Sequence, residues 1–224
     1  LASAAYDDFL EFIAVLVPGG AFSEQLKQLR AGDRLRVDKA SYGFLTVDQL
    51  AAGKDLWMLS SGTGLGPFLS ILQDPAVWQN YERLIVAHSV RHSSELAWRD
   101  EIADIPKREL FADAKATLTY LPIVTREPGA TPLTERIPLL LADGRLEAAA
   151  TCPLDVATSV GWTTDLGSDD ATLGWAGVIE ERRLDITRLE VPHAPEPDAA
   201  ALAAWASVLT DALARVDASG PVAR

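Results

Sequence analysis

A glycine-rich turn between an apolar strand and an apolar helix constrains the fold of this chain more than any other feature. Residues 56–69 read LWMLSSGTGLGPFL. Glycines let the backbone turn tightly and approach a ligand, and the helix that follows directs N–H groups and its positive dipole end toward an anion. Pro67 suits the first helical turn, where a missing N–H group costs nothing. The turn is therefore a candidate phosphate site, although a tight turn that binds no ligand explains these residues equally well.

The composition excludes several classes of protein. The chain has 224 residues and is 48% hydrophobic, which is enough for one large or two small domains with buried cores. No apolar run is long enough for a transmembrane helix or a signal peptide. The formal net charge of −12 argues against binding to nucleic acid and against docking on an anionic membrane.

Cysteine and histidine are too sparse to predict a metal site. Cys152 is the only cysteine, which excludes an internal disulfide and suits a reducing compartment, the cytoplasm; we expect a half-buried loop thiol. The histidines His88, His92 and His193 show no ligand spacing, so a structural zinc ion is not expected. His88 ends a predicted buried strand, and we expect its ring to be satisfied in the core. No serine–histidine–aspartate set or carboxylate pair points to a catalytic side chain.

Residues 1–52 alternate between apolar and polar positions. The alternation predicts strands at 9–17, 33–39 and 44–47. A short helix is predicted at 23–29, with Ser23 as its N-cap. Together these elements predict a small antiparallel sheet or barrel with one helix inserted.

From residue 53 the pattern changes to strands that alternate with helices. Strands are predicted at 56–59, 83–88 and 116–124, and helices at 67–72, 94–102 and 136–141. This alternation predicts βαβ units and an α/β fold with a doubly wound parallel sheet. Ligands bind such sheets at the C-terminal ends of the strands, which is where the turn at 62–67 is expected.

Three arginines lie at the same level of the predicted sheet as this turn. Arg91 follows the strand at 83–88, Arg126 follows the strand at 116–124, and Arg136 opens the next helix. Guanidinium groups bind phosphate through paired hydrogen bonds, so the three together predict a site for a second phosphate, such as the 2′-phosphate of a dinucleotide. Any one of them alone is better explained as a solvated surface side chain.

Several segments, in their order along the chain, resemble the bacterial ferredoxin/flavodoxin–NADP reductases. Residues 20–23 (GAFS) are similar to that family's flavin-diphosphate motif at a helix start. Residues 57–72 match its nicotinamide-dinucleotide phosphate loop, with Gly66 in place of the usual alanine. Further matches are HSVR at 88–91 with ELAWRD at 95–100, VTRE at 124–127 and TERIP at 134–138.

The resemblance implies a fold, two cofactors and a reaction. It implies a residual FAD-binding barrel half at 1–52 and an NADP-binding domain at 53–155. The reaction would pass hydride between NADPH and FAD, and electrons to a ferredoxin or flavodoxin, while the protein binds and orients the cofactors. The implied FAD-binding residues are Leu1, Ala2, Ser3, Gly20, Ala21, Phe22 and Ser23. The implied NADP-binding residues are Ser61, Gly62, Thr63, Gly64, Pro67, Arg91, Arg126 and Arg136.

Both ends of the chain depart from the family pattern. Of the family's Arg-x-Tyr-Ser flavin signature and its short tail, only Leu1-Ala2-Ser3 is present, so we expect a chain truncated at its N-terminus. After about Asp155 the family's apolar strand and Cys-Gly-x-Pro turn are not found, and Cys152 is not equated with that cysteine. We therefore expect a divergent segment and linker at 156–197 and a helical tail at 198–224.

These departures leave two functions open. The chain is either a flavin-dependent NADP reductase of this family, or an incomplete or inactive remnant that acts at most as an NADP-binding module. The preserved central motifs favour the first reading. The missing flavin and nicotinamide segments favour the second for this particular polypeptide.

Overall fold

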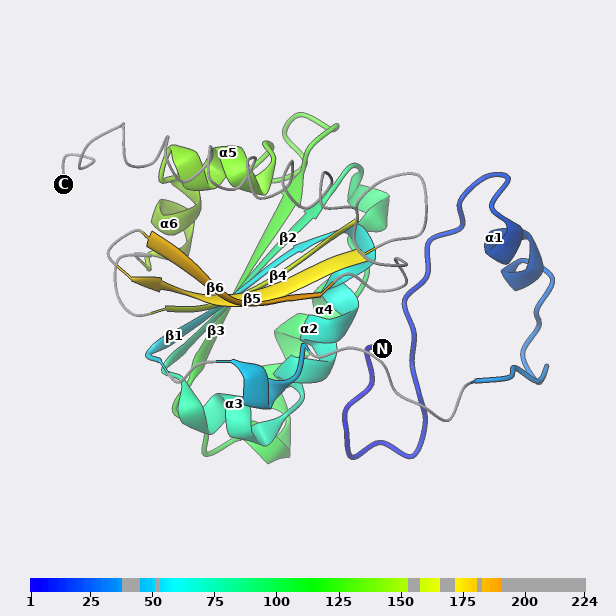
Figure 1. The fold of residues 1–224 in the computed structure, drawn as a ribbon, viewed down its shortest axis with the longest axis horizontal. Coiled ribbons are helices and arrows are strands. Elements are labelled where there is room, and N and C mark those ends of the chain that lie inside the picture. Colours follow the sequence, from blue (N-terminus) through cyan, green and yellow to red (C-terminus); the bar gives the residue numbers. More distant parts are fainter. Residues whose placement is uncertain (38–44, 51–52, 153–157, 166–171, 181–182, 191–224) are drawn as a thin grey trace.

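A twisted six-stranded sheet forms the centre of the protein (Figure 1). The computed structural model describes residues 1–37, 45–50, 53–152, 158–165, 172–180 and 183–190. The strands are β1 (Asp55–Ser61), β2 (Arg83–Val90), β3 (Thr117–Val124), β4 (Thr158–Asp165), β5 (Thr172–Glu180) and β6 (Arg183–Glu190). They lie in the order β3-β2-β1-β4-β5-β6.

Helices cover both faces of this sheet. The α-helices are α1 (Ala21–Leu26), α2 (Leu65–Leu72), α3 (Pro75–Asn80), α4 (Arg99–Asp104), α5 (Ile137–Ala142) and α6 (Arg145–Ala150). The 3-10 helices are η1 (Val47–Gln49), η2 (Gly62–Gly64), η3 (Ser93–Glu95), η4 (Ile105–Lys107) and η5 (Glu109–Phe111). In Figure 1, α5 and α6 lie on one side of the sheet, and α2 and α3 lie on the other.

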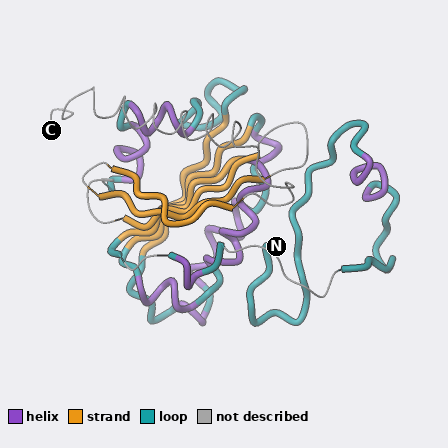
Figure 2. Tube along the Cα trace, in the orientation of Figure 1, coloured by secondary structure: helices purple, strands orange, loops and turns teal. Residues whose placement is uncertain are grey.

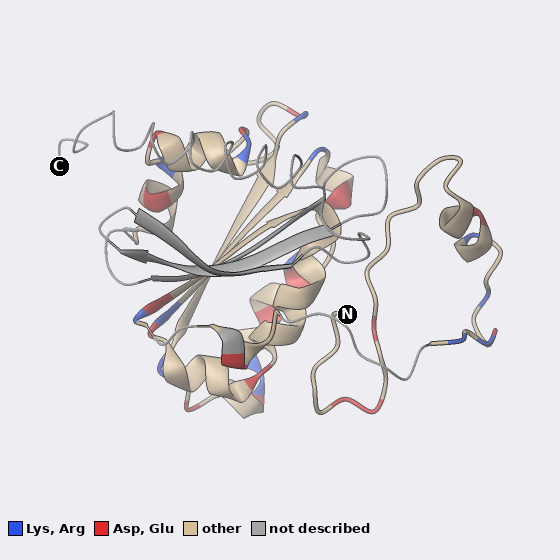
Figure 3. Ribbon diagram, in the orientation of Figure 1, with Lys and Arg blue, Asp and Glu red and all other residues tan. Residues whose placement is uncertain are grey.

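The strand pairing confirms the predicted α/β fold with a parallel sheet. Strand β1 pairs in parallel with β2 on one side and with β4 on the other, and β2 pairs in parallel with β3. Strands β5 and β6 continue the sheet in antiparallel pairing. Figure 3 shows that β1, β2 and β3 carry almost no charge beyond the beginnings of β1 and β2.

Alternate side chains of β1 enter two separate cores. Trp57 and Leu59 pack in one cluster with Leu140 of α5. Leu56 and Met58 point to the opposite face and pack in the cluster that includes α2 and α3. Since helices cover both faces, the central strand β1 is buried at every position from Asp55 to Ser60.

A buried ion pair joins the beginnings of β1 and β2. Asp55 is fully buried, and its two carboxylate oxygens accept hydrogen bonds from Nε and Nη2 of Arg83, both at 2.6 Å. The thiol of Cys152 lies 3.5 Å from the same carboxylate and donates to it. Burial first, and then the charge of Asp55, raise the pKa of Cys152 to about 11, so the thiol stays protonated. Cys152 is fully buried, and the prediction of a half-buried loop thiol is wrong.

The predicted strands of residues 1–52 do not form in the described residues 1–37 and 45–50. Residues 9–17 and 33–37 have no regular secondary structure, and Figure 2 shows this part mainly as loop. A strand needs a neighbour to accept and donate its backbone hydrogen bonds. Among the described residues, the segment 9–17 meets the start of the chain only at Glu11, whose carbonyl accepts from Ala2 N at 2.7 Å and whose N–H donates to the hydroxyl of Ser3 at 3.2 Å, and this pairing does not extend into a ladder. Most apolar side chains of residues 9–17 consequently stay exposed, Phe9 and Phe12 among them, while Ile13 is half-buried against the core on the α2 side of the sheet. The barrel remains a prediction.

Helix α1 begins earlier than the sequence predicts. Its N-cap is Gly20, so Ser23 is not the cap, and the helix ends before the predicted span of 23–29 does. Ser23 lies inside the first turn, where its buried hydroxyl accepts a hydrogen bond from the backbone N–H of Val17 at 2.9 Å. Ser23 thus holds the preceding loop on the helix instead of capping it.

The segment predicted to diverge contributes strands to the same sheet. Within 156–197, the backbone of β4 lies beside β1, and β5 and β6 extend the sheet beyond it. The rest of that segment from 191 to 197, which is expected to form a linker, and the expected helical tail at 198–224 lie outside the described residues. Among the residues that the structure describes, none of the helices is long and apolar enough to span a membrane.

We expect Arg83→Met to lower the free energy of unfolding by about 3 kcal/mol, because it leaves the carboxylate of Asp55 buried without its ionic partner. Urea unfolding followed by tryptophan fluorescence measures this change.

Lys54→Met is the matched control. Lys54 and Glu82 form an exposed pair, with 3.4 Å between Nζ and Oε2, and such pairs contribute at most about 1 kcal/mol. Equal losses in the two variants would contradict a structural role for the Asp55–Arg83 pair.

Candidate phosphate-binding site

Strand β1 carries the glycine-rich turn to the C-terminal edge of the parallel sheet, as predicted. The turn forms η2, and Gly64 is the N-cap of α2. Gly62 has a φ of +53°, in the left-handed region that favours glycine. The turn lies at the N-terminus of α2, so the positive end of the helix dipole faces it, and Gly64 has no side chain to cap the first N–H groups. Ser61, Thr63 and the first-turn residue Pro67 therefore lie at one anion-attracting edge.

His88 ties this turn to the neighbouring strands. Its side chain is fully buried, and His88 lies within β2, two residues before the strand ends at Val90. Nε2 lies 3.0 Å from the carbonyl oxygen of Gly62, and Nδ1 lies 3.2 Å from the hydroxyl of Tyr120. The expectation of a satisfied core histidine is confirmed. Burial lowers the pKa of His88, so the ring is held neutral.

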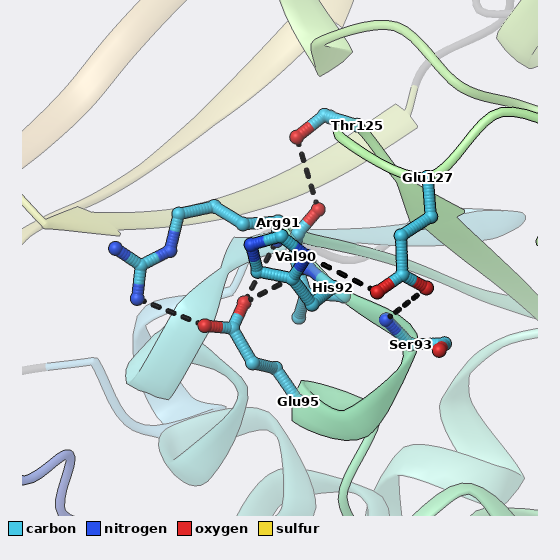
Figure 4. Close-up of polar contacts among 7 residues, drawn as sticks. All are labelled: Val90, Arg91, His92, Ser93, Glu95, Thr125 and Glu127. Carbon is cyan, nitrogen blue, oxygen red and sulfur yellow. Dashed lines mark hydrogen bonds and ion pairs between the residues drawn. The ribbon is translucent and has the colours of Figure 1, made fainter.

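The segments after β2 and β3 run side by side, and they bring Arg91 close to Arg126. The backbone N–H of Arg126 donates to the carbonyl of Arg91 at 2.9 Å. Thr125 donates to the carbonyl of Val90 through both its backbone N–H at 2.9 Å and its hydroxyl at 3.1 Å (Figure 4). Both arginines are exposed, so two of the three predicted cationic residues lie on one pair of segments that three hydrogen bonds join.

Arg136 is exposed at the N-cap of α5. The chain leading to it is anchored at the end of β3, because the hydroxyl of Thr131 accepts from Val124 N at 2.9 Å and donates to Leu133 O at 2.6 Å. Leu133 also forms a parallel bridge with Ile123. The backbone hydrogen bond between Arg126 and Arg91 brings two of the three arginines together, and Arg136 lies on the next connection, at the N-cap of α5.

Glu95 holds the segment that carries Arg91. One carboxylate oxygen accepts from Nη2 of Arg91 at 2.8 Å, and the other accepts from the backbone N–H groups of Arg91 at 2.8 Å and His92 at 3.2 Å (Figure 4). Partial burial raises the pKa of Glu95, but these hydrogen bonds outweigh it and lower the pKa below its ordinary value. A carboxylate that was not predicted as a site residue thus orients the arginine.

Glu127 fixes the same segment from the side of β3. Its carboxylate lies 3.1 Å from Nδ1 of His92 and accepts from the backbone N–H of Ser93 at 3.0 Å (Figure 4). The hydrogen bonds from Ser93, and then those from His92, lower the pKa of Glu127. Glu127 was not predicted as a site residue from the sequence. Its place directly after Arg126, just beyond a predicted strand, is the feature that could have indicated it.

The predicted helix at 94–102 is interrupted. Only η3 and α4 are helical, and Trp98 between them has a φ of +61°, which a tryptophan adopts at a cost of about 1 kcal/mol. Glu95 closes a capping box with His92 at the start of η3, and the interruption lies three residues later, at Trp98. An open depression of about 480 Å³ lies at this interrupted segment. It is lined by Ser93, Leu96, Trp98, Arg99, Asp100, Glu101 and Ala130.

The seven residues predicted to bind FAD fall into two groups. Leu1, Ala2 and Ser3 lie along α2, where Ala2 and Ser3 are buried and the carbonyl of Ala2 accepts from Gln73 Nε2 at 3.0 Å. The group at 20–23 begins α1, which Figure 1 shows on a projecting segment away from the N-terminus. The structure does not bring the two groups together.

Known proteins are similar to this chain in sequence and in fold. Ferredoxin–NADP reductase of Pseudomonas aeruginosa is 45% identical over 130 residues, which are 57% of this chain and 50% of that protein. Flavodoxin/ferredoxin–NADP reductase of Escherichia coli is 35% identical over 150 residues, 67% of this chain and 58% of that protein. The crystal structure of a ferredoxin NADP+ reductase from Neisseria gonorrhoeae with bound FAD and NADP matches with a TM-score of 0.66 and 32% identity, over 74% of this chain and 65% of that one.

This chain is a relative of the bacterial ferredoxin/flavodoxin–NADP reductases. The resemblance stated from the motifs is therefore confirmed. No family model matches the chain. The chain spans about half the length of the curated relatives it matches. The assignment of individual residues to FAD or NADP stays a prediction.

Gly66 replaces the alanine that the reductases usually have, and the structure shows room for that alanine. A Cβ at this position would lie 3.5 Å from Cδ1 of Ile13 and 3.5 Å from the carbonyl oxygen of Leu1, which is ordinary contact. We expect Gly66→Ala to raise the free energy of unfolding by about 0.5–1 kcal/mol, because alanine favours the helix. Thermal unfolding measures this gain.

Gly62→Ala is the contrasting control, because a Cβ in the left-handed region costs about 1–2 kcal/mol. A loss of stability in Gly66→Ala as large as that in Gly62→Ala would contradict the described packing around α2.

Proposed function

We propose that this chain forms the NADP-binding part of an oxidoreductase of the ferredoxin/flavodoxin–NADP reductase type, in which hydride passes between NADPH and FAD. The observation that carries this proposal is the placement of the turn at 62–64 and of Arg91 and Arg126 along one edge of the parallel sheet. The names of the relatives, and the FAD and NADP bound in the Neisseria gonorrhoeae structure, support the choice of cofactors.

The residues at this edge fit a phosphorylated dinucleotide. The turn at 62–64 and the start of α2 would hold the diphosphate, since this is where the helix dipole is positive. Arg126 and Arg136 take part in no ion pair within the described residues, so their charges are not compensated by a carboxylate. With Arg91 they would hold the 2′-phosphate. When bound, NADPH supplies the hydride; the protein positions it.

The residues predicted to contact FAD do not fit that group as one site. Ala2 and Ser3 are nearly inaccessible, and the residues at 20–23 lie on a separate segment. We therefore assign the residues of this chain to the NADP side of the reaction, and we derive no step through FAD.

The alternative is an NADP-binding module without productive flavin. Two observations support this alternative: most apolar side chains of residues 9–17 are exposed, and no strand forms in the described residues 1–37 and 45–50.

For the complete reaction we propose a ferredoxin or flavodoxin as the electron partner, because the names of the relatives include these proteins. We propose the cytoplasm as the compartment.

The visible spectrum of the purified chain separates these two functions. For the reductase we expect a yellow protein with flavin absorption near stoichiometry that also binds a 2′,5′-ADP resin. A colourless protein that binds the resin would support the module, and a chain that neither binds the resin nor carries flavin would contradict both.

We expect Arg126→Ala to weaken binding of NADPH about 30-fold, which corresponds to about 2 kcal/mol for a lost charge-assisted contact. Binding of NADH should stay unchanged, because NADH lacks the 2′-phosphate. Isothermal titration calorimetry with each nucleotide measures both affinities.

Arg108→Ala is the control, because Arg108 contacts Gln73 on another part of the surface and should change neither affinity. Equal losses for NADPH and NADH in Arg126→Ala would remove the assignment of Arg126 to the 2′-phosphate.

A further inference from the structure

We propose that His88 is a positioning residue that sets the conformation of the phosphate loop through the carbonyl of Gly62, and thereby sets the affinity for the dinucleotide diphosphate. This inference rests on the proposed NADP site. It goes beyond that site because His88 is buried behind the turn, where it takes no direct part in ligand contact.

The geometry is a chain of hydrogen bonds that crosses three adjacent strands. Tyr120 lies on β3, His88 lies on β2, and Gly62 directly follows the end of β1. The hydroxyl of Tyr120 is 3.2 Å from Nδ1 of His88, and Nε2 of His88 is 3.0 Å from the carbonyl oxygen of Gly62. His88 and Tyr120 belong to strands of the sheet, whereas Gly62 lies in the turn, so this chain of hydrogen bonds fixes the carbonyl of Gly62 relative to β2 and β3.

The partners fix the direction of these bonds. A carbonyl oxygen only accepts, so Nε2 of His88 must carry the proton, and in the neutral ring Nδ1 must accept from the hydroxyl of Tyr120. Burial lowers the pKa of His88 and raises the pKa of Tyr120 to about 12, so both groups are neutral near pH 7. The nearby charges are Glu95, which raises the pKa of His88, and Arg99, which lowers that of Tyr120; neither reverses the effect of burial.

The carbonyl of Gly62 controls the orientation of the next N–H group in the turn. In a planar trans peptide, the C=O bond of Gly62 and the N–H bond of Thr63 point in opposite directions. Holding the carbonyl against His88 therefore directs the Thr63 N–H away from β2. Gly62 has no Cβ and adopts a φ of +53°, so without this hydrogen bond its peptide plane is free to choose among several orientations.

The test compares three variants of the whole chain in calorimetric titrations with NADPH and NADH. His88→Leu removes the donor, and we expect the affinity for both nucleotides to fall about tenfold, with their ratio unchanged, because both carry the diphosphate. His88→Gln places an amide N–H donor where Nε2 lies, and we expect it to restore affinity to within about threefold of wild type. Tyr120→Phe removes the group that orients the ring, and we expect about a threefold loss.

The wild-type titration separates this inference from the proposed function. If the wild-type chain binds neither nucleotide, the NADP site itself is wrong and the positioning role falls with it. If the wild type binds, then unchanged affinity in His88→Leu, or a loss in His88→Gln as large as in His88→Leu, overturns the role of His88 alone. Should His88→Leu fail to fold, Tyr120→Phe decides, and wild-type affinity in that variant overturns the proposal.

Discussion

Burial of β1 on both faces is the constraint on which the rest of the structure depends. Its side chains enter two cores, one under α5 and α6 and one under α2 and α3, and it pairs in parallel with β2 and with β4. Two cores cover the faces of β1 and two strands pair with its edges, so the chain continues from β1 at the C-terminal edge of the sheet. The chain must therefore turn at 62–64 and enter α2 there, and the candidate phosphate site is a consequence of that position.

The two ends of β1 are stabilised by different chemistry. At its beginning, the buried carboxylate of Asp55 is neutralised by Arg83 and hydrogen-bonded by the protonated thiol of Cys152, an arrangement that serves stability. At its end, the carbonyl of Gly62 is held by the neutral ring of His88, an arrangement that serves orientation. Charge is thus compensated within the protein at the beginning of β1. Beyond the ends of β2 and β3, Arg91 is paired with Glu95, whereas Arg126 takes part in no ion pair among the described residues.

The sequence predicted the central fold well, because β1, β2 and β3 are almost continuously apolar and the glycine turn is local. It missed α3, whose signal was Asp74 before a proline; its side chain caps the helix at 2.8 Å from Ala76 N. It predicted strands at 9–17 and 33–39, since alternation reports a preferred face but not the presence of a partner strand. In the candidate site, the sequence pointed to the arginines but not to Glu95 or Glu127. The carboxylates of these two residues accept hydrogen bonds from backbone N–H groups of residues 91–93, and such contacts depend on local backbone geometry that the spacing of residues in the sequence does not reveal.

The central claim is that the turn after β1 and the segments after β2 and β3 form one dinucleotide site. A two-dimensional amide NMR titration of the whole chain with NADP+ tests it most directly. The account predicts saturable chemical-shift changes at the amides of residues 62–65, Arg91 and Arg126. Apart from Arg136, the amides of α5 and α6 should change little. Shifts confined to another part of the surface, or none at saturating nucleotide, would contradict it.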